Sequence, residues 1–154
     1  MAQNAADGSE GFEKSQSGGG PGSRATEGVR TPAGDVYDWY QRGMQLLSGG
    51  DPAAAVHVLE HAVAAEPQSR NLREALARAH YDARQYAAAR ANFAQLVESD
   101  PTDDYAQFGW GLAARKMGDL QEAVEHLALA AAMRPDLGHY GRELRGARAE
   151  RARR

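Results

Sequence analysis

The chain has 154 residues, of which 42% are hydrophobic, and a net charge of −3. This length suffices for one compact domain, and the absence of cysteine excludes disulfides, thiolate metal sites and cysteine nucleophiles. No stretch approaches the ~20 apolar residues of a membrane span, and no apolar signal segment follows the first methionine, so we expect a cytoplasmic protein.

Residues 1–34 are expected to form a disordered, Gly/Ser-rich arm. They hold eight of the 17 glycines and a single aromatic residue, Phe12. Residues 17–23 read Ser-Gly-Gly-Gly-Pro-Gly-Ser, the composition of a flexible linker. Such a segment buries too little apolar surface to offset the entropy that folding removes.

From residue 35 to residue 137 the sequence repeats with a period of 34 residues. Three prolines and three alanines recur at this spacing: Pro67, Pro101 and Pro135, and Ala55, Ala89 and Ala123. Apolar residues follow each alanine at four and seven positions, which places three side chains on one face of a helix. A fixed period of this length is typical of repeat arrays. The sequence therefore predicts three repeats, at 36–69, 70–103 and 104–137.

A second apolar stripe predicts another helix before each of these helices. Its middle position is small in all three repeats: Gly43, Ala77 and Gly111. Because glycine costs a helix interior about 1 kcal/mol relative to alanine, two glycines at this position indicate a tight crossing with a neighbouring helix.

Polar residues, glycine and proline separate the expected helices. Asp51 followed by Pro52 is typical of a helix start, and Asp119 with Glu122 resembles a capping box. The turn of the second repeat, around Arg84, lacks glycine. The prolines of the 34-residue period are expected to end the second helix of each pair, because the residue before proline avoids the helical region.

Residues 138–154 are expected to form a basic capping helix. Tyr140, Leu144 and Ala147 give one narrow apolar stripe, and six arginines outnumber two glutamates in this part of the chain. A repeat array ends in an exposed apolar face, so it needs a terminal element with a polar outer side. We interpret the arginines as that solvated side. Nucleic-acid binding is disfavoured, because few aromatic residues are interleaved with them and residues 35–136 are acidic.

Together these features resemble the tetratricopeptide repeat (TPR) family, whose pattern is Trp, Leu-Gly and Tyr, then Ala with a large apolar residue, then Pro. The first repeat shows Trp39, Gly43, Leu46, Ala55, Leu59 and Pro67; the second keeps Leu76, Ala77, Ala89, Phe93 and Pro101; the third keeps Trp110, Gly111, Ala123, Leu127 and Pro135. Arg73 and Gln107 stand where the family has tryptophan, and Arg42 where it has leucine. The resemblance implies an all-α, right-handed α-solenoid of three helix-turn-helix repeats plus a C-terminal capping helix.

The resemblance also implies a function and a binding surface. TPR proteins are non-catalytic scaffolds without a cofactor, and their concave wall is built from the first helix of each pair. The corresponding inward residues are Tyr37, Tyr40, Met44, Leu47, Asn71, Arg78, Tyr81, Tyr105, Phe108, Leu112, Arg115 and Lys116. Aromatic residues and arginine are enriched among interface anchors, so a peptide or helix of another protein is the expected partner. Arg78, Arg115 and Lys116 add a positive centre that would suit a peptide with carboxylates. The same aromatic residues could instead serve packing within the protein. The arm or the capping helix could also occupy the groove.

One TPR subtype is disfavoured by matching. Family members that clamp the C-terminal carboxylate of chaperones do so with lysine, asparagine and arginine side chains. The matching residues here are Tyr40, Met44, Ala75, Tyr105 and Gly109. None of them supplies the required charge or amide group.

Two alternative functions stay open. The first is a self-associating structural protein whose exposed end faces stack between chains. The second is a zinc-dependent hydrolase, because His57, Glu60 and His61 match the H-x-x-E-H motif. A third ligand is not evident, and the motif lies within an alanine-rich helix of the first repeat, so we expect no metal site.

Overall fold

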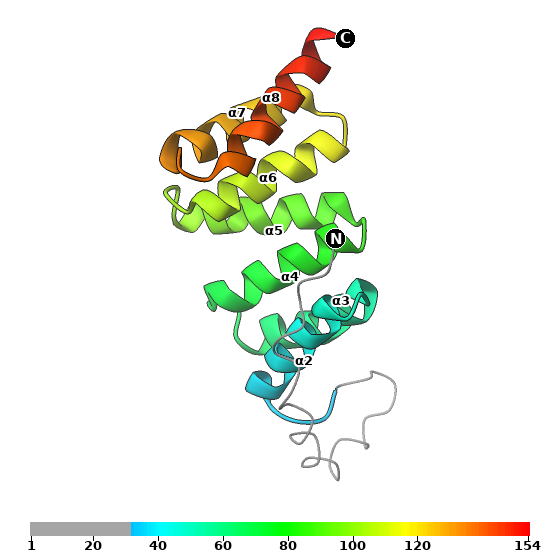
Figure 1. Ribbon diagram of the computed structural model, residues 1–154. Helices are drawn as coiled ribbons and strands as arrows, with labels where there is room; N and C mark the ends of the chain where they lie inside the picture. Colours follow the sequence, from blue (N-terminus) through cyan, green and yellow to red (C-terminus); the bar gives the residue numbers. More distant parts are fainter. Residues whose placement is uncertain (1–31) are drawn as a thin grey trace. The chain divides into compact units, whose positions relative to one another are not determined.

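The computed structural model describes residues 32–154, so nearly all of the expected arm, residues 1–31, lies outside the described residues. The described part is built from helices joined by turns, which confirms the all-α prediction (Figure 1). The helices are α2 (Val36–Ser48), α3 (Pro52–Ala65), α4 (Arg70–Asp82), α5 (Tyr86–Ser99), α6 (Asp104–Lys116), α7 (Leu120–Met133) and α8 (Gly138–Ala152). They form two compact units: an N-terminal unit that ends at Ala83, and a C-terminal unit from Arg84 to Arg154. None of these helices is long and apolar enough to cross a membrane.

The N-terminal unit contains α2, α3 and α4, with α3 packed against both of the other helices. Its core is formed by apolar residues from all three helices: Leu47, Ala55, Val56, Leu59, Ala75, Leu76 and Ala79. The crossing of α2 and α3 is tight, because a Cβ atom on Gly43 would lie 2.6 Å from Cγ of Leu59. This contact confirms the tight crossing that the small residue at this repeat position predicted.

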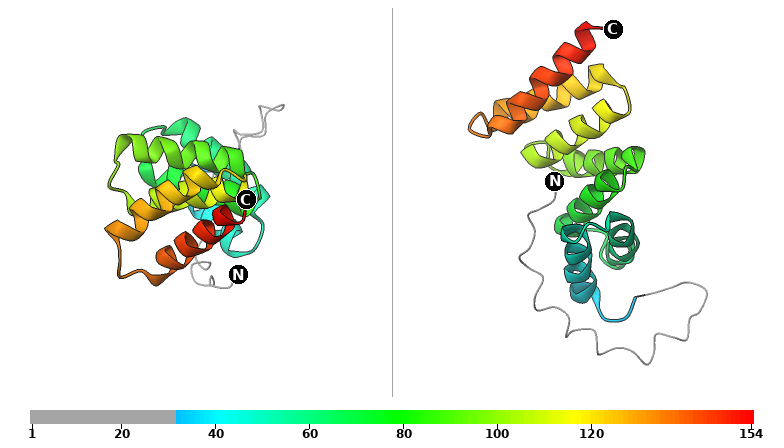
Figure 2. Two further views of the ribbon diagram at one scale, coloured as in Figure 1. Left: turned by 90° about the horizontal axis from the view of Figure 1, so that it is seen from above. Right: turned by 45° about the vertical axis from the view of Figure 1, so that its right-hand side comes forward.

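The C-terminal unit contains α5 to α8, in which each helix packs against the next (Figure 2). Its core consists of Phe108, Ala114, Ala123, Val124, Leu127, Ala130, Tyr140, Leu144 and Ala147. The last three residues are the predicted apolar stripe of the capping helix, which is buried against the repeats as expected. Gly111 repeats the close approach of the first repeat, since its Cβ atom would lie 2.7 Å from Cγ of Leu127.

Most helix starts are capped by a side chain. In five of the described helices an N-cap oxygen accepts a hydrogen bond from the backbone N–H three residues later: Asp35, Asp51, Ser69, Asp103 and Asp119. The caps expected at Asp51 and Asp119 are confirmed. The capping box expected between Asp119 and Glu122 is incomplete, because the Glu122 carboxylate contacts two other side chains instead. A complete capping box joins Asp35 and Asp38.

The turn inside each helix pair uses the left-handed backbone region. Its central residue has a positive φ in all three repeats: Gly50 (87°), Arg84 (65°) and Gly118 (87°). Glycine enters this region without steric cost, whereas a side chain makes it unfavourable. The second repeat therefore forms the same turn as the other two while lacking the residue that best tolerates it.

The position of the TPR tryptophan is filled by a different residue in each repeat, yet the contact is the same. Each side chain donates a hydrogen bond to the carbonyl oxygen six residues upstream: Trp39 to Ala33 (3.1 Å), Arg73 to Pro67 (3.3 Å) and Gln107 to Pro101 (3.0 Å). The repeat thus requires an N–H donor of sufficient reach at this position. This requirement explains why Arg73 and Gln107 replace tryptophan without loss of the fold.

Candidate functional site

Three of the expected groove residues meet at a hollow in the N-terminal unit. Tyr37 and Tyr40 come from α2 and Asn71 from the first turn of α4. The hollow has a volume of about 350 Å³, and its other lining residues are Val36, Glu66, Ser69 and Leu72. The Tyr37 side chain is 67% exposed, which is unusual for a large aromatic residue in a folded unit. A concave surface with exposed aromatic side chains is suited to binding another molecule.

The ends of the helices fix the positions of these residues. The capping box of Asp35 and Asp38 fixes the start of α2. Asp35 is the N-cap, and Val36 and Tyr37 are the first two residues of the helix. At the opposite side, Ser69 Oγ accepts the backbone N–H of Leu72 at 3.2 Å and so fixes the start of α4. A side-chain cap thus fixes the start of each of the two helices that contribute lining side chains.

Glu66 is the one charged residue among those that line the hollow. It follows the last residue of α3 as its C-cap, and its carboxylate is exposed, with no hydrogen bond or ion pair to any described residue. The last carbonyl groups of α3 add partial negative charge at this end of the helix. Glu66 is not part of the repeat pattern, and its place in a loop between two helices, where functional residues often lie, is the one signal in the sequence that points to it.

The other expected residues of the N-terminal unit have different surroundings. Leu47 is 7% exposed and belongs to the core, whereas Met44 and Tyr81 are half-buried. The Arg78 guanidinium lies 3.9 Å from the carboxylate of Asp82, the residue one helical turn later. Burial raises the pKa of Asp82, and the positive charge of Arg78 partly opposes this effect.

In the C-terminal unit, two of the expected groove residues contact the capping helix. Phe108 is 8% exposed, and its ring stacks on Tyr140 of α8 with 4.3 Å between ring centroids. The Arg115 guanidinium donates to Glu143 at 3.0 Å and to Glu150 at 2.8 Å, both on α8. The hydrogen bond to Glu150 is the main cause that raises the pKa of Arg115. Both side chains thus help to hold α8 in place.

The remaining expected residues of this unit lie near other side chains of the same unit. Tyr105 approaches the ring of Phe93 edge-on, with 6.0 Å between centroids. Leu112 packs against the core, and the Lys116 ammonium lies 5.9 Å from the ring centroid of Tyr86. Among the described residues, the hollow of the N-terminal unit is therefore the concave surface for which several expected groove residues are lining residues.

The histidines of the H-x-x-E-H motif do not form a larger ligand set. His57 and His61 lie edge-on, with 5.1 Å between their ring centroids, and the other neighbour of His61 is the Trp39 ring at 6.2 Å. Among residues 32–154, no group of three or more histidine, aspartate or glutamate side chains is placed to hold a metal ion. A catalytic zinc site uses three protein ligands, and the two histidines have no third ligand beside them among the described residues.

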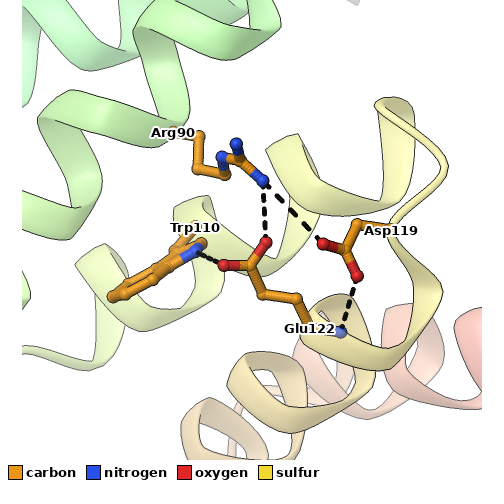
Figure 3. Close-up of polar contacts among 4 residues, drawn as sticks. All are labelled: Arg90, Trp110, Asp119 and Glu122. Carbon is orange, nitrogen blue, oxygen red and sulfur yellow. Dashed lines mark hydrogen bonds and ion pairs between the residues drawn. The ribbon is translucent and has the colours of Figure 1, made fainter.

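A polar network in the C-terminal unit was missed by the sequence analysis (Figure 3). The Glu122 carboxylate on α7 accepts hydrogen bonds from Arg90 of α5 and from the indole N–H of Trp110 of α6, each at 2.9 Å. Arg90 also lies 4.0 Å from Asp119. The available signal was a break in the repeat, since the positions equivalent to Arg90 hold valine in the other two repeats. Because its members satisfy one another, the network joins three helices and offers no open ligand position.

His126 extends this network on α7. Its ring stacks on Trp110 with 3.7 Å between centroids, and its Nδ1 lies 2.7 Å from Oε1 of Gln107. Burial lowers the pKa of His126, and the nearby carboxylates of Glu122 and Glu125 partly oppose this effect. The fold therefore favours the neutral ring at this position.

Comparison with known proteins places these features in context. Family models described as tetratricopeptide repeat match residues 46–115 and 105–136, which together make up more than half of the chain. Superkiller complex protein 3 of Mus musculus is 29% identical over 100 residues, which are 65% of this chain but 6% of that protein. The chain thus spans a small part of the curated relative that it matches.

Solved structures show the same fold. MamA 41-end from Desulfovibrio magneticus RS-1 matches with a TM-score of 0.73 and 23% identity, over 77% of this chain and 67% of that one. The first TPR of Spaghetti (RPAP3), bound to the HSP90 peptide SRMEEVD, matches with a TM-score of 0.71 and 19% identity, over 76% of this chain and 93% of that one. Identities of this size indicate a shared architecture and carry no information about a shared ligand.

Proposed function

The chain belongs to the tetratricopeptide repeat family, and on that premise we propose that it is a non-catalytic adaptor that holds a peptide or helix of another protein. The docking surface in this proposal is the hollow of the N-terminal unit, with Tyr37, Tyr40 and Asn71 as the contacting residues. The remaining members of the expected groove stay predictions. Leu47 and Phe108 have the least surface to offer, because the first lies in the core and α8 covers the second. Arg115 pairs with two glutamates of α8.

The observation that carries this proposal is the exposure of aromatic surface around a concavity. A soluble unit gains free energy by burying a side chain such as Tyr37, so its exposure next to Tyr40 and Val36 favours a role in binding. Tyrosine is well suited to this role because it buries a large area with few rotatable bonds. The peptide bound by the first TPR of Spaghetti supports the proposal, since a unit of this fold there holds a short segment of another protein.

Replacement of both tyrosines tests the proposal. A partner is first isolated from a native extract with the wild-type chain, and its Kd is then measured by calorimetry. The double variant Tyr37→Ala/Tyr40→Ala is expected to lose roughly 2 kcal/mol of binding free energy, which raises the Kd about 30-fold. The matched control is Leu129→Ala on α7, which removes an exposed apolar side chain (47% exposed) far from the hollow in sequence. An unchanged Kd for the double variant would remove the hollow from the function.

Self-association is a second candidate, and one observation favours it. The arginines on the outer side of α8, including Arg142, Arg145 and Arg148, are exposed and make no ion pair with any described residue. Residues 35–136 carry an excess of acidic side chains, so two copies of the chain have complementary charges. Light scattering over a wide concentration range tests this candidate; a constant monomer mass argues against it.

A further inference from the structure

We propose that the hollow of the N-terminal unit receives a basic side chain, arginine or lysine, from the bound partner segment. Glu66 is the counter-ion in this arrangement, and the rings of Tyr37 and Tyr40 flank the cation. The inference rests on the proposed adaptor function and specifies the chemistry of the segment that the adaptor binds.

The shape and lining of the hollow suit a long side chain with a charged end. Its volume of about 350 Å³ lies near the lower limit of ligand pockets, which span roughly 300–1,000 Å³, so it accommodates one side chain rather than a folded element. Val36 and Leu72 offer apolar surface to a methylene stem. Tyr37 and Tyr40 are its two aromatic lining residues, and a cation is attracted by the negative face of an aromatic ring.

The charge of the hollow favours a cation over an anion. Glu66 supplies its one ionisable charge at neutral pH, and this carboxylate has no partner among the described residues. The carboxyl end of α3 reinforces the negative potential at Glu66. The amino end of α4 would oppose it, but Ser69 already accepts one of the N–H groups there. Arg70 and Arg73, the basic residues next in sequence to Asn71 and Leu72, do not line the hollow, and Arg73 donates to the carbonyl oxygen of Pro67.

This preference is the reverse of what the sequence indicates. Arg78, Arg115 and Lys116 suggested a positive centre that would receive a peptide rich in carboxylates. In the structure Arg115 is paired with two glutamates of α8, and Arg78 lies near Asp82. The negative charge at the hollow, on Glu66, has no counter-ion among residues 32–154.

Two peptides that differ only in charge test the inference. The probes are a short alanine/glycine peptide with one central arginine and the same peptide with citrulline, which is neutral and has the same shape. Binding to the full chain is followed by NMR through the ring signals of Tyr37 and Tyr40. We expect the arginine peptide to bind at least about fivefold more tightly than the citrulline peptide at low salt, and the difference to shrink as salt is added.

The variant Glu66→Gln removes the charge and preserves the shape of the side chain. It is expected to abolish the preference for arginine, with an unchanged thermal midpoint because Glu66 is exposed and has no partner among the described residues. The matched control is Glu98→Gln, which neutralises a glutamate on α5 that is likewise exposed and without a partner in the described part of the chain, and it should leave the preference intact. Equal binding of the two peptides, or a preference that survives in Glu66→Gln, overturns the inference.

The failure of this inference is distinguishable from failure of the adaptor function. If the Kd of the captured partner rises in the double tyrosine variant but is unchanged in Glu66→Gln, the adaptor proposal stands and the proposal of a basic side chain is wrong. If the preference for arginine depends on Glu66 but the Kd of the captured partner is unchanged in the double tyrosine variant, the hollow binds cations and the adaptor surface lies elsewhere.

Discussion

The ring of Phe93 lies directly against the backbone of α6 at Gly109, where a Cβ atom would be 2.4 Å from two of the ring carbons. In the preceding repeat the same two positions hold Leu59 and Ala75, which lie together in the core of the N-terminal unit. A larger side chain in one repeat is thus matched by a smaller residue on the facing helix. The combined volume of the two side chains is therefore kept similar in both repeats. Protein interiors are packed as densely as crystals, so a larger residue at one position requires a smaller one at the other.

The first prediction follows from this pair. Gly109→Ala introduces a methyl group that clashes with the ring of Phe93, and it should lower the free energy of unfolding by about 2–3 kcal/mol. Phe93→Leu alone leaves a void and should cost about 1 kcal/mol. The double variant recreates the pair found in the preceding repeat and should recover most of the loss. Urea unfolding followed by circular dichroism measures all three, and additive losses in the double variant would contradict the volume exchange.

The second prediction concerns the strained turn of the second repeat. Arg84 has a φ of 65°, a conformation that the other two repeats give to glycine. Arg84→Gly should raise the free energy of unfolding by about 0.5–1 kcal/mol, because relief of the steric cost exceeds the added entropy of the unfolded chain. Gly118→Ala is the matched converse and should lose a similar amount. A loss of stability in Arg84→Gly would show that the arginine side chain contributes more than its backbone costs.

The repeat period made the helices predictable, because it fixes apolar spacing, turn residues and helix ends within stretches of a few residues. Gly43, Gly111 and the apolar stripe of α8 are local patterns of this kind, and the structure confirms them. Even the irregular tryptophan position obeys a local rule, since Arg73 and Gln107 reach the same upstream carbonyl oxygen that a tryptophan reaches.

The candidate site was less predictable, because it depends on which charges find partners across helices. Arg115 pairs with Glu143 and Glu150, which lie far along the chain and on another helix. Glu66 is an ordinary loop residue by its sequence, and its lack of a partner among residues 32–154 is a property of the folded chain. Periodicity states which face of a helix points inward or outward, but it does not state how charges on separate helices pair.

The third prediction is a pH dependence that His126 causes. Burial lowers the pKa of His126 below its ordinary value of 6.5, so the folded chain binds fewer protons here than the unfolded chain. Its contribution to stability is intact above pH 6.5 and is lost as the pH falls from there toward the folded pKa. The free energy of unfolding should therefore fall as the pH is lowered from about 6.5 toward the folded pKa.

The variant His126→Phe tests this assignment. It keeps an aromatic ring on Trp110 and removes the titration, so the fall in stability over this pH range should shrink. Loss of the contact with Gln107 lowers the free energy of unfolding by the same amount across this pH range. It therefore does not change how steeply that free energy depends on pH. His57→Gln, at an exposed position, is the control and should keep the wild-type pH dependence. An unchanged slope in His126→Phe would assign the effect to other groups.

The last prediction concerns the attachment of α8. Arg115 is bound by Glu143 and Glu150 on one side of that helix, and the ion pairs are partly exposed, with 29% of the arginine side chain accessible. Arg115→Met should cost about 1 kcal/mol, and added salt should weaken the wild type more than the variant. Arg142→Met is the matched control, because it removes an exposed arginine of α8 that has no ion pair with any described residue.

Gly146→Ala should act on the same contact, since its Cβ atom would lie 2.9 Å from Nη2 of Arg115 and displace the guanidinium. If both Arg115→Met and Gly146→Ala leave the unfolding midpoint at its wild-type value at low salt, the stacked Tyr140 ring and the apolar stripe hold α8 without help from these charges.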